Sequence, residues 1–139
     1  KLNRDRMIRV VEQEKTSFIN QFIPSLYNEE NLERLKEEIN MQIEFANKMK
    51  PKEITAALAG MKERDSHLDT LAFAKVPVLF ILGRHDSRIP VEKVLAQVAI
   101  PQTSQLLILG NSGHMGWQEE PQKTIAAIDG FMKLCNNEY

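Results

Sequence analysis

Residues 76–86 read VPVLFILGRHD, in which an apolar run over 76–82 leads directly into the polar loop 83–86. A second apolar run, LLIL at 106–109, leads in the same way into the loop GNSGH at 110–114. Continuous apolar runs bounded by glycine and polar residues are typical of strands that are buried on both faces of a parallel sheet. The interval between the two runs is long enough for a crossover helix, so the strands are predicted to be parallel neighbours.

The two loops end in a carboxylate and an imidazole, those of Asp86 and His114. The carboxyl ends of parallel strands meet at one edge of a sheet, and neighbouring strands are only about 4.8 Å apart. We therefore expect the two side chains to lie within hydrogen-bond range, where the carboxylate orients the imidazole and the imidazole moves a proton. Each residue also has a plain structural interpretation, Asp86 as a turn residue and His114 as a loop histidine bonded to backbone. The pair together favours a catalytic acid and base.

The loop around His114 also contains candidates for a substrate pocket. Its glycines permit a positive φ and a close approach of the backbone to a ligand. Trp117 is suited to line a pocket for an acyl or alcohol group. It is also suited to pack the loop onto the sheet, and both interpretations stay open. Met115, which follows His114 directly, is assigned to the same pocket.

The sequence contains no evident nucleophile to complete this pair. An acid and a histidine commonly activate a Ser, Cys or Asp that sits on a tight strand-to-helix turn. No Gly-x-Ser-x-Gly motif occurs, and GNSG at 110–113 has the wrong spacing and lies beside the histidine. The single cysteine, Cys135, falls near the end of a predicted helix. The catalytic apparatus is therefore predicted to be incomplete in this sequence.

Composition excludes several classes of function. A formal net charge of −1 over 139 residues provides no electrostatic footprint for nucleic acid or for an anionic membrane. No apolar stretch approaches the roughly 20 residues that span a bilayer. One cysteine excludes an internal disulfide framework, and no His/Cys cluster has metal-ligand spacing, so no metal or organic cofactor is expected. These features are compatible with a reducing cytoplasm, the expected location, although a periplasmic protein without disulfides would have the same composition.

The chain is predicted to change from helices to alternating strands and helices near residue 70. Residues 1–68 form an all-helical segment, and residues 69–139 form a strand–helix–strand–helix unit. The helices expected from apolar periodicity, capping residues and proline cover 4–22, a stretch that begins after Asn28, 51–64, 91–98 and a final stretch from Pro121. Two parallel strands do not make a sheet that stands alone, so at least one strand edge is expected to pair with a segment that this sequence lacks.

Three blocks of the sequence resemble the C-terminal half of an α/β-hydrolase-fold enzyme. They are AALAGMKERD at 56–65, the stretch 76–86 with Ile89 and Pro90, and Gly113-His114 followed by Glu119-Glu120-Pro121. Residues 1–68 resemble the helical cap that such enzymes insert before their last strands. The resemblance implies an α/β fold that comprises the C-terminal part of the hydrolase's parallel sheet, two strands with flanking helices, preceded by an all-helical cap.

The resemblance also implies roles for the two loop residues. Asp86 matches the acid and His114 the base of a nucleophile–acid–histidine triad, in the family's chain order. The first strands, the oxyanion loop and the nucleophile elbow of the family are absent from this sequence, and Lys1 is not an initiator methionine. The missing N-terminal half of the same protein is therefore an expected partner, together with a small-molecule substrate.

Three functions stay open on this basis. The leading hypothesis is part of a small-molecule hydrolase of ester, thioester or amide bonds, serine-dependent and without a cofactor, in which this chain alone is inactive. Because the nucleophile is unseen, an aspartate-dependent dehalogenase or epoxide hydrolase is an alternative, and so is a non-catalytic binding or interaction module on the hydrolase scaffold. The elbow residue in whatever sequence precedes Lys1 discriminates them, since Ser, Cys or Asp supports an enzyme and Gly or Ala supports a binding module.

Overall fold

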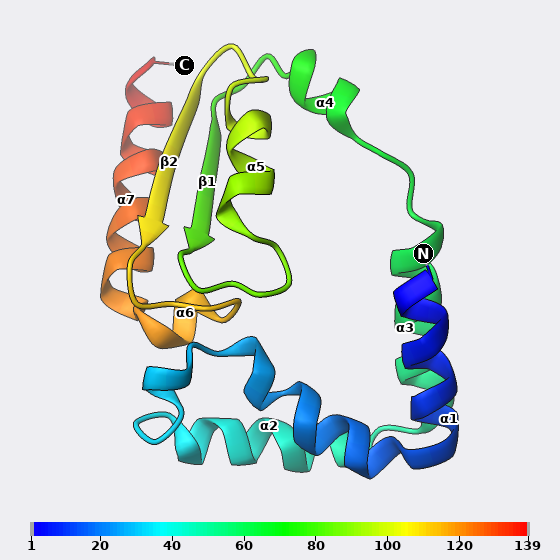
Figure 1. Ribbon diagram of the computed structural model, residues 1–139. Helices are drawn as coiled ribbons and strands as arrows, with labels where there is room; N and C mark the ends of the chain where they lie inside the picture. The colour runs from blue at the N-terminus through cyan, green and yellow to red at the C-terminus, as the bar shows by residue number, and fades with distance from the viewer. Residues whose placement is uncertain (1, 139) are drawn as a thin grey trace. The chain divides into compact units, whose positions relative to one another are not determined.

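The computed structural model describes residues 2–138, and the chain divides into two compact units. The first unit is formed by Lys1–Ser25 and Arg34–Ser66, and the second by Leu26–Glu33 and His67–Tyr139. Helices alone make the first unit, whereas the second contains two strands with helices beside them (Figure 1). The short segment 26–33 therefore belongs to the unit that contains the sheet, although residues of the first unit flank it in the sequence.

Three helices make the first unit, α1 (Leu2–Phe22), α2 (Lys36–Lys48) and α3 (Pro51–Glu63). α1 contacts both of the others and is kinked at Glu14, whose φ of −140° and ψ of 55° are not helical. The Lys15 ammonium donates to the carbonyls of Asn47 at 2.6 Å and Met49 at 2.8 Å. It thereby satisfies carbonyls that the end of α2 leaves without helical partners. The buried apolar side chains of this unit are Val11, Ile19, Ile23, Leu35, Ile39 and Leu58.

The helix expected directly after Asn28 is divided in the structure. Asn28 does cap a helical turn, since its Oδ1 accepts from the amide of Glu30 at 3.4 Å, but that turn is the short 3-10 helix η2 (Glu29–Asn31). A similar turn, η1 (Pro24–Leu26), precedes it, and α2 begins only at Lys36. The sequence prediction of one continuous helix was wrong because the segment around Asn28 is bonded to a distant loop, as described below.

The sheet of the second unit has the predicted parallel topology. β1 (Val78–Gly83) pairs with β2 (Ser104–Leu109), in a register that joins Val78 to Ser104 and Gly83 to Leu109. The crossover helix α5 (Val91–Val98) has the expected bounds, and α7 (Pro121–Glu138) starts at the expected proline. The two strands lie between α5 and α7 (Figure 1). Two short helices that the sequence did not predict, α4 (Leu68–Ala72) and α6 (Gly116–Glu119), complete the unit.

The strands are less buried than their sequences predict. Only the last residue of each strand, Gly83 and Leu109, is buried, and the apolar residues 78–82 are all half-buried. A sheet of two strands is the physical reason, because each strand has a neighbouring strand on one side only. The expectation of strands buried on both faces is therefore not met within the described residues.

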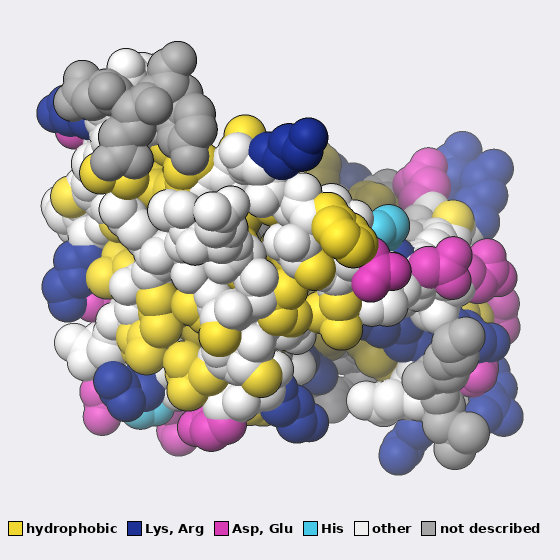
Figure 2. Space-filling model, turned by 90° about the horizontal axis from the view of Figure 1, so that it is seen from above, with side chains coloured by type: hydrophobic (Ala, Val, Ile, Leu, Met, Phe, Trp, Pro, Cys, Tyr) yellow, Lys and Arg dark blue, Asp and Glu magenta, His cyan; other side chains and the backbone are white. Residues whose placement is uncertain are grey.

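Apolar side chains are also exposed on the helices of this unit. Ile125, Ile128 and Met132 follow one another at helical spacing on α7 and are 66%, 46% and 52% exposed. Hydrophobic side chains gather over the sheet and its helices in the space-filling view (Figure 2). Within residues 2–138, no helix is both long and apolar enough to cross a membrane.

Candidate active site

Asp86 and His114 face each other across the loops that follow β1 and β2. The distance from Asp86 Oδ2 to His114 Nδ1 is 2.7 Å, which confirms the predicted hydrogen bond. The other carboxylate oxygen of Asp86, Oδ1, accepts from the amides of Arg88 at 2.8 Å and Ile89 at 2.9 Å. The Asp86 side chain is 9% exposed and that of His114 is 36% exposed. The carboxylate is thus fixed by the backbone of its own loop, and the imidazole is open to solvent on part of its surface.

Backbone hydrogen bonds extend the strand pairing into these two loops. The amide of Arg84 donates to the carbonyl of Leu109, and the amide of His85 to that of Ser112, both at 2.9 Å. The backbone of Gly83 passes so close to the histidine loop that a Cβ there would overlap the carbonyl oxygen of Gly113. Glycine at position 83 is therefore what lets the acid loop and the histidine loop lie against each other.

Gly113 makes a second close approach, on the other side of the histidine loop. A Cβ at Gly113 would lie 2.8 Å from the amide nitrogen of Asn28 and from the carbonyl oxygen of Leu26. The amide of His114 donates to that same Leu26 carbonyl at 2.7 Å. No residue in the described part of the chain has a positive φ, so the expectation that these glycines supply one was wrong. They instead permit backbone to pack on backbone.

A buried carboxylate, that of Glu119, holds this arrangement together. Both of its oxygens accept hydrogen bonds: Oε2 from the amide of Gly113 at 2.7 Å, and Oε1 from the amide of Asn28 at 2.7 Å and from the Asn31 side chain at 2.9 Å. Glu119 is only 3% exposed. From the sequence Glu119 was identified only as part of a family motif, and this role was missed because its partners Asn28 and Asn31 lie 91 and 88 residues away.

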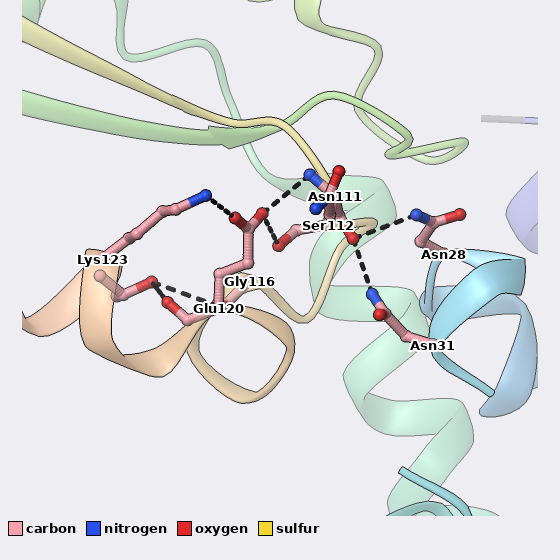
Figure 3. Close-up of polar contacts among 8 residues, drawn as sticks. Asn28, Asn31, Asn111, Ser112, Gly116, Glu120 and Lys123 are labelled. Atoms are coloured by element: carbon pink, nitrogen blue, oxygen red, sulfur yellow. Dashed lines mark hydrogen bonds and ion pairs between the residues drawn. The ribbon is translucent and has the colours of Figure 1, made fainter. Parts of the chain in front are cut away.

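The start of the same loop is held by Glu120 and by two asparagines (Figure 3). Glu120 Oε2 accepts from the amide of Asn111 at 2.9 Å and from the hydroxyl of Ser112 at 2.8 Å, and Lys123 bonds its other oxygen. The carbonyl of Asn111 accepts from the side chains of Asn28 at 3.0 Å and Asn31 at 2.6 Å. Burial by itself would raise the pKa of Glu120, but the bonds from Lys123, Asn111 and Ser112 hold that pKa below its ordinary value.

The two residues assigned to a substrate pocket differ in exposure. Trp117 in α6 is 57% exposed, so most of its indole is available for contacts. Met115, which precedes α6, is 8% exposed and packs inside the unit. Their role in a pocket stays a prediction. Within residues 2–138, no group of three or more His, Cys, Asp and Glu side chains is arranged to hold a metal ion.

Solved structures of several hydrolases are similar to this chain over nearly its whole length. A thermophilic esterase from Thermogutta terrifontis is 27% identical, with a TM-score of 0.84 over 96% of this chain. An alpha/beta hydrolase enzyme from a Medee basin deep-sea metagenome library is 18% identical, with a TM-score of 0.79 over 94% of it. The enol-lactonase from Burkholderia xenovorans is 14% identical, with a TM-score of 0.83 over 92% of it.

This chain covers 49% of each of those three structures. No protein-family model matches the sequence, and no curated protein matches it. The structural similarity nevertheless defines the class, because it includes the two parallel strands, their crossover helix and the helices that precede them. The chain has the α/β-hydrolase fold, of which it contains about half, as the sequence resemblance predicted.

Proposed function

We propose that this chain supplies the acid and the base of a nucleophile–acid–histidine triad in a small-molecule hydrolase. Asp86 is the acid and His114 the base, and the observation that carries the proposal is the 2.7 Å hydrogen bond between them. This bond joins loops that leave adjacent parallel strands at the edge where α/β sheets hold their reactive groups. The nucleophile and the oxyanion-hole donors are proposed to come from an N-terminal half that lies outside this chain.

The proposed proton transfers follow from this hydrogen bond. With Nδ1 protonated and facing Asp86, the other ring nitrogen, Nε2, carries the lone pair that accepts the nucleophile's proton. The carboxylate stabilises the positive charge that forms on the ring, and its second oxygen is held meanwhile by two backbone amides. Nε2 then gives the proton to the leaving group, and afterwards takes one from the water that attacks the acyl-enzyme.

The proposed substrate class is a small-molecule ester. Two of the similar proteins are called an esterase and an enol-lactonase, and the esterase is 27% identical to this chain. A non-catalytic module on the same scaffold needs neither a fixed carboxylate nor a ring held against it, so the Asp86–His114 pair favours an enzyme. An aspartate nucleophile, as in a dehalogenase or epoxide hydrolase, is the alternative that the test below separates.

The remaining parts of the proposal concern the chain's own surfaces. Residues 1–68 are proposed to act as the cap over the site, and Trp117 and Met115 to line the substrate pocket. The proposed N-terminal half pairs with the open edge of β1 and covers the apolar face of α7. Exposed apolar side chains on that helix support this part of the proposal, because monomeric proteins rarely leave contiguous apolar patches uncovered.

The experiment uses the full-length protein in which this chain is joined to its N-terminal half. Turnover of p-nitrophenyl esters and labelling by a fluorophosphonate, read by intact mass, are expected for a serine hydrolase. An aspartate nucleophile would give neither ester turnover nor the label but would turn over a haloalkane or an epoxide, and absence of all of these activities would contradict the enzyme assignment. His114→Ala should lower kcat by at least about 10⁴-fold. His85→Ala is the matched control, because this neighbouring loop histidine is exposed and contributes a backbone bond that alanine retains.

A further inference from the structure

We propose that Glu119 is a positioning residue that fastens the His114 loop to segment 26–33 and so fixes the imidazole against Asp86. The inference rests on the proposed role of His114 as the base. Glu119 reaches that loop at the amide of Gly113, the residue directly before His114. The next amide, that of His114 itself, donates to the carbonyl of Leu26. The consecutive amides of Gly113 and His114 are therefore both hydrogen-bonded. Glu119 accepts from the first, and segment 26–33, which Glu119 also binds, accepts from the second.

The two oxygens of Glu119 accept hydrogen bonds from two different segments. A side-chain amide, which has only one oxygen, cannot accept from both. Oε2 faces the amide of Gly113, whereas Oε1 faces the amide of Asn28 and the side chain of Asn31. A glutamine has one acceptor oxygen and one NH2 donor. On one of these two sides, its NH2 group would therefore face another N–H donor, and the hydrogen bond there would be lost. Glu119 is only 3% exposed, so bulk solvent has little access to the unpaired group and the loss is expected to be costly.

The consequence of that loss falls on the orientation of His114. Releasing the amide of Gly113, or the segment that bonds the amide of His114, lets the loop shift relative to Asp86. Glu119 acts through the loop backbone rather than on the reacting atoms, so its effect is expected on kcat more than on KM. A misplacement of about 1 Å costs as much as about 100-fold in rate.

The neighbouring Glu120 provides a matched control on the same loop. A single oxygen of Glu120, Oε2, accepts both from Asn111 and from Ser112, whereas its other oxygen bonds the exposed Lys123. A glutamine at position 120 therefore keeps both loop bonds with its carbonyl oxygen and gives up the contact with Lys123. Glu119→Gln and Glu120→Gln each remove one negative charge from adjacent residues. They differ in whether the histidine loop keeps its hydrogen bonds to the side chain that is changed.

The test compares Glu119→Gln with Glu120→Gln in the full-length protein. We expect Glu119→Gln to lower kcat by about 10- to 100-fold with KM within about twofold, and Glu120→Gln to change kcat by less than about threefold. The His114 ring signals in ¹H–¹⁵N NMR should shift or broaden in the first variant and not in the second. Asn31→Ala, which removes one donor to Glu119 and one to Asn111, should change both readouts in the same direction, by a smaller amount.

Two outcomes would overturn the inference. One is a Glu119→Gln variant with unchanged kcat and unchanged His114 signals, and the other is an equal loss in both glutamine variants. If Glu119→Gln does not fold, Asn31→Ala takes its place: lower kcat with shifted His114 signals supports the inference, and no change in either contradicts it. The proposed function fails separately, through an active His114→Ala variant or an inactive wild type. In that case the NMR signals of His114 still report whether Glu119 fixes the ring.

Discussion

At Asp86 the two carboxylate oxygens have different partners, and this predicts the effect of its amide isostere. In Asp86→Asn the side-chain oxygen would turn toward the amides of Arg88 and Ile89, so the NH2 group would face His114 Nδ1. The ring would then carry its proton on Nε2, the wrong tautomer for a base. We expect Asp86→Asn to lower kcat by about 10³- to 10⁴-fold, of the order that a wrong tautomer causes in a serine protease.

The measurement for Asp86→Asn is ester turnover by the full-length protein, with circular dichroism as the folding control. Because the backbone bonds of the Asp86 loop survive the substitution, the spectrum and the unfolding midpoint should stay close to those of the wild type. A variant that folds normally and retains near-parental kcat would remove Asp86 from the mechanism.

The residues of the site differ in how far sequence alone reveals them. Asp86 and His114 were predictable because strand ends meet at one edge of a parallel sheet, and a short loop keeps each side chain near its strand. Glu119 was not predictable in the same way, since its carboxylate accepts from Asn28 and Asn31, whose proximity depends on the tertiary fold. Sequence shows that a carboxylate is present, but not that distant donors converge on it.

At the scale of secondary-structure elements, local signals predicted the helices that depend on local chemistry. α5 and α7 begin beside prolines and have apolar positions at helical spacing, so their starts were predicted correctly. The break between η2 and α2 was missed, because the side chain of Asn31, the last residue of η2, bonds Asn111 and Glu119 and so holds this turn against the histidine loop. Helix propensity is a weak prior, and tertiary hydrogen bonds override it.

The close contact between the end of β1 and the histidine loop makes a prediction for Gly83. In Gly83→Ala the new Cβ would clash with the backbone of Gly113, which has no side-chain freedom to move away. We expect a loss of about 3 kcal/mol in the free energy of unfolding, at the upper end of overpacking costs. Gly110→Ala is the matched control, because a Cβ there meets nothing within 4 Å and the φ is not positive, so its change should stay within about 0.5 kcal/mol.

Denaturant unfolding of the full-length protein measures both glycine variants. The same preparations should show reduced ester turnover for Gly83→Ala, because the two loops that carry Asp86 and His114 are pushed apart. Equal stability of the two variants would mean that the loops are not packed together as described.

The hydrogen bonds of Glu120 to the histidine loop and to Lys123 are expected to weaken in acid. The pKa of Glu120 is lowered in the folded state, so folding favours its ionised form. Its contribution to stability is fully present above the ordinary pKa of 4.5 and is lost as the pH falls through the lower, folded value. The difference in unfolding free energy between wild type and Glu120→Gln, measured by denaturant titration, should therefore be larger at pH 7 than at pH 3. A difference that is the same at both pH values would contradict this assignment.

At the scale of the whole molecule, the sequence predicted the class of fold but not how the chain is divided between its two units. Strand runs and the crossover length predicted two parallel strands, and the resemblance of three sequence blocks to α/β hydrolases predicted the class of the sheet, which the similar structures bear out. The interpretation of residues 1–68 as a cap stays a proposal. Segment 26–33 lies inside that range and yet packs with the histidine loop in the second unit. The segment has no local sequence signature, because its partners are the amide of His114, the carbonyl of Asn111 and the carboxylate of Glu119, all of them distant in the sequence.

The last prediction concerns residues 1–139 produced alone, which we expect neither to hydrolyse esters nor to fold as a stable monomer. Activity should be absent because an imidazole without a nucleophile and oxyanion donors lacks the interactions that dominate such catalysis. Folding should fail for a separate reason. The two-stranded sheet leaves apolar, half-buried strands and an open edge on β1, and such an edge invites association with other chains.

Sedimentation and thermal unfolding of the isolated chain test the folding part, and ester turnover tests the other. We expect self-associated material without a cooperative transition, and recovery of a cooperative transition and of turnover when the N-terminal half is supplied in the same polypeptide. The exposed side chains of α7 offer an internal check, since charged residues in place of Ile125 and Ile128 should impair the full-length protein if the N-terminal half covers them. A monomer of 16.0 kDa that unfolds cooperatively and hydrolyses esters would overturn both the need for that half and the division of the triad between two halves.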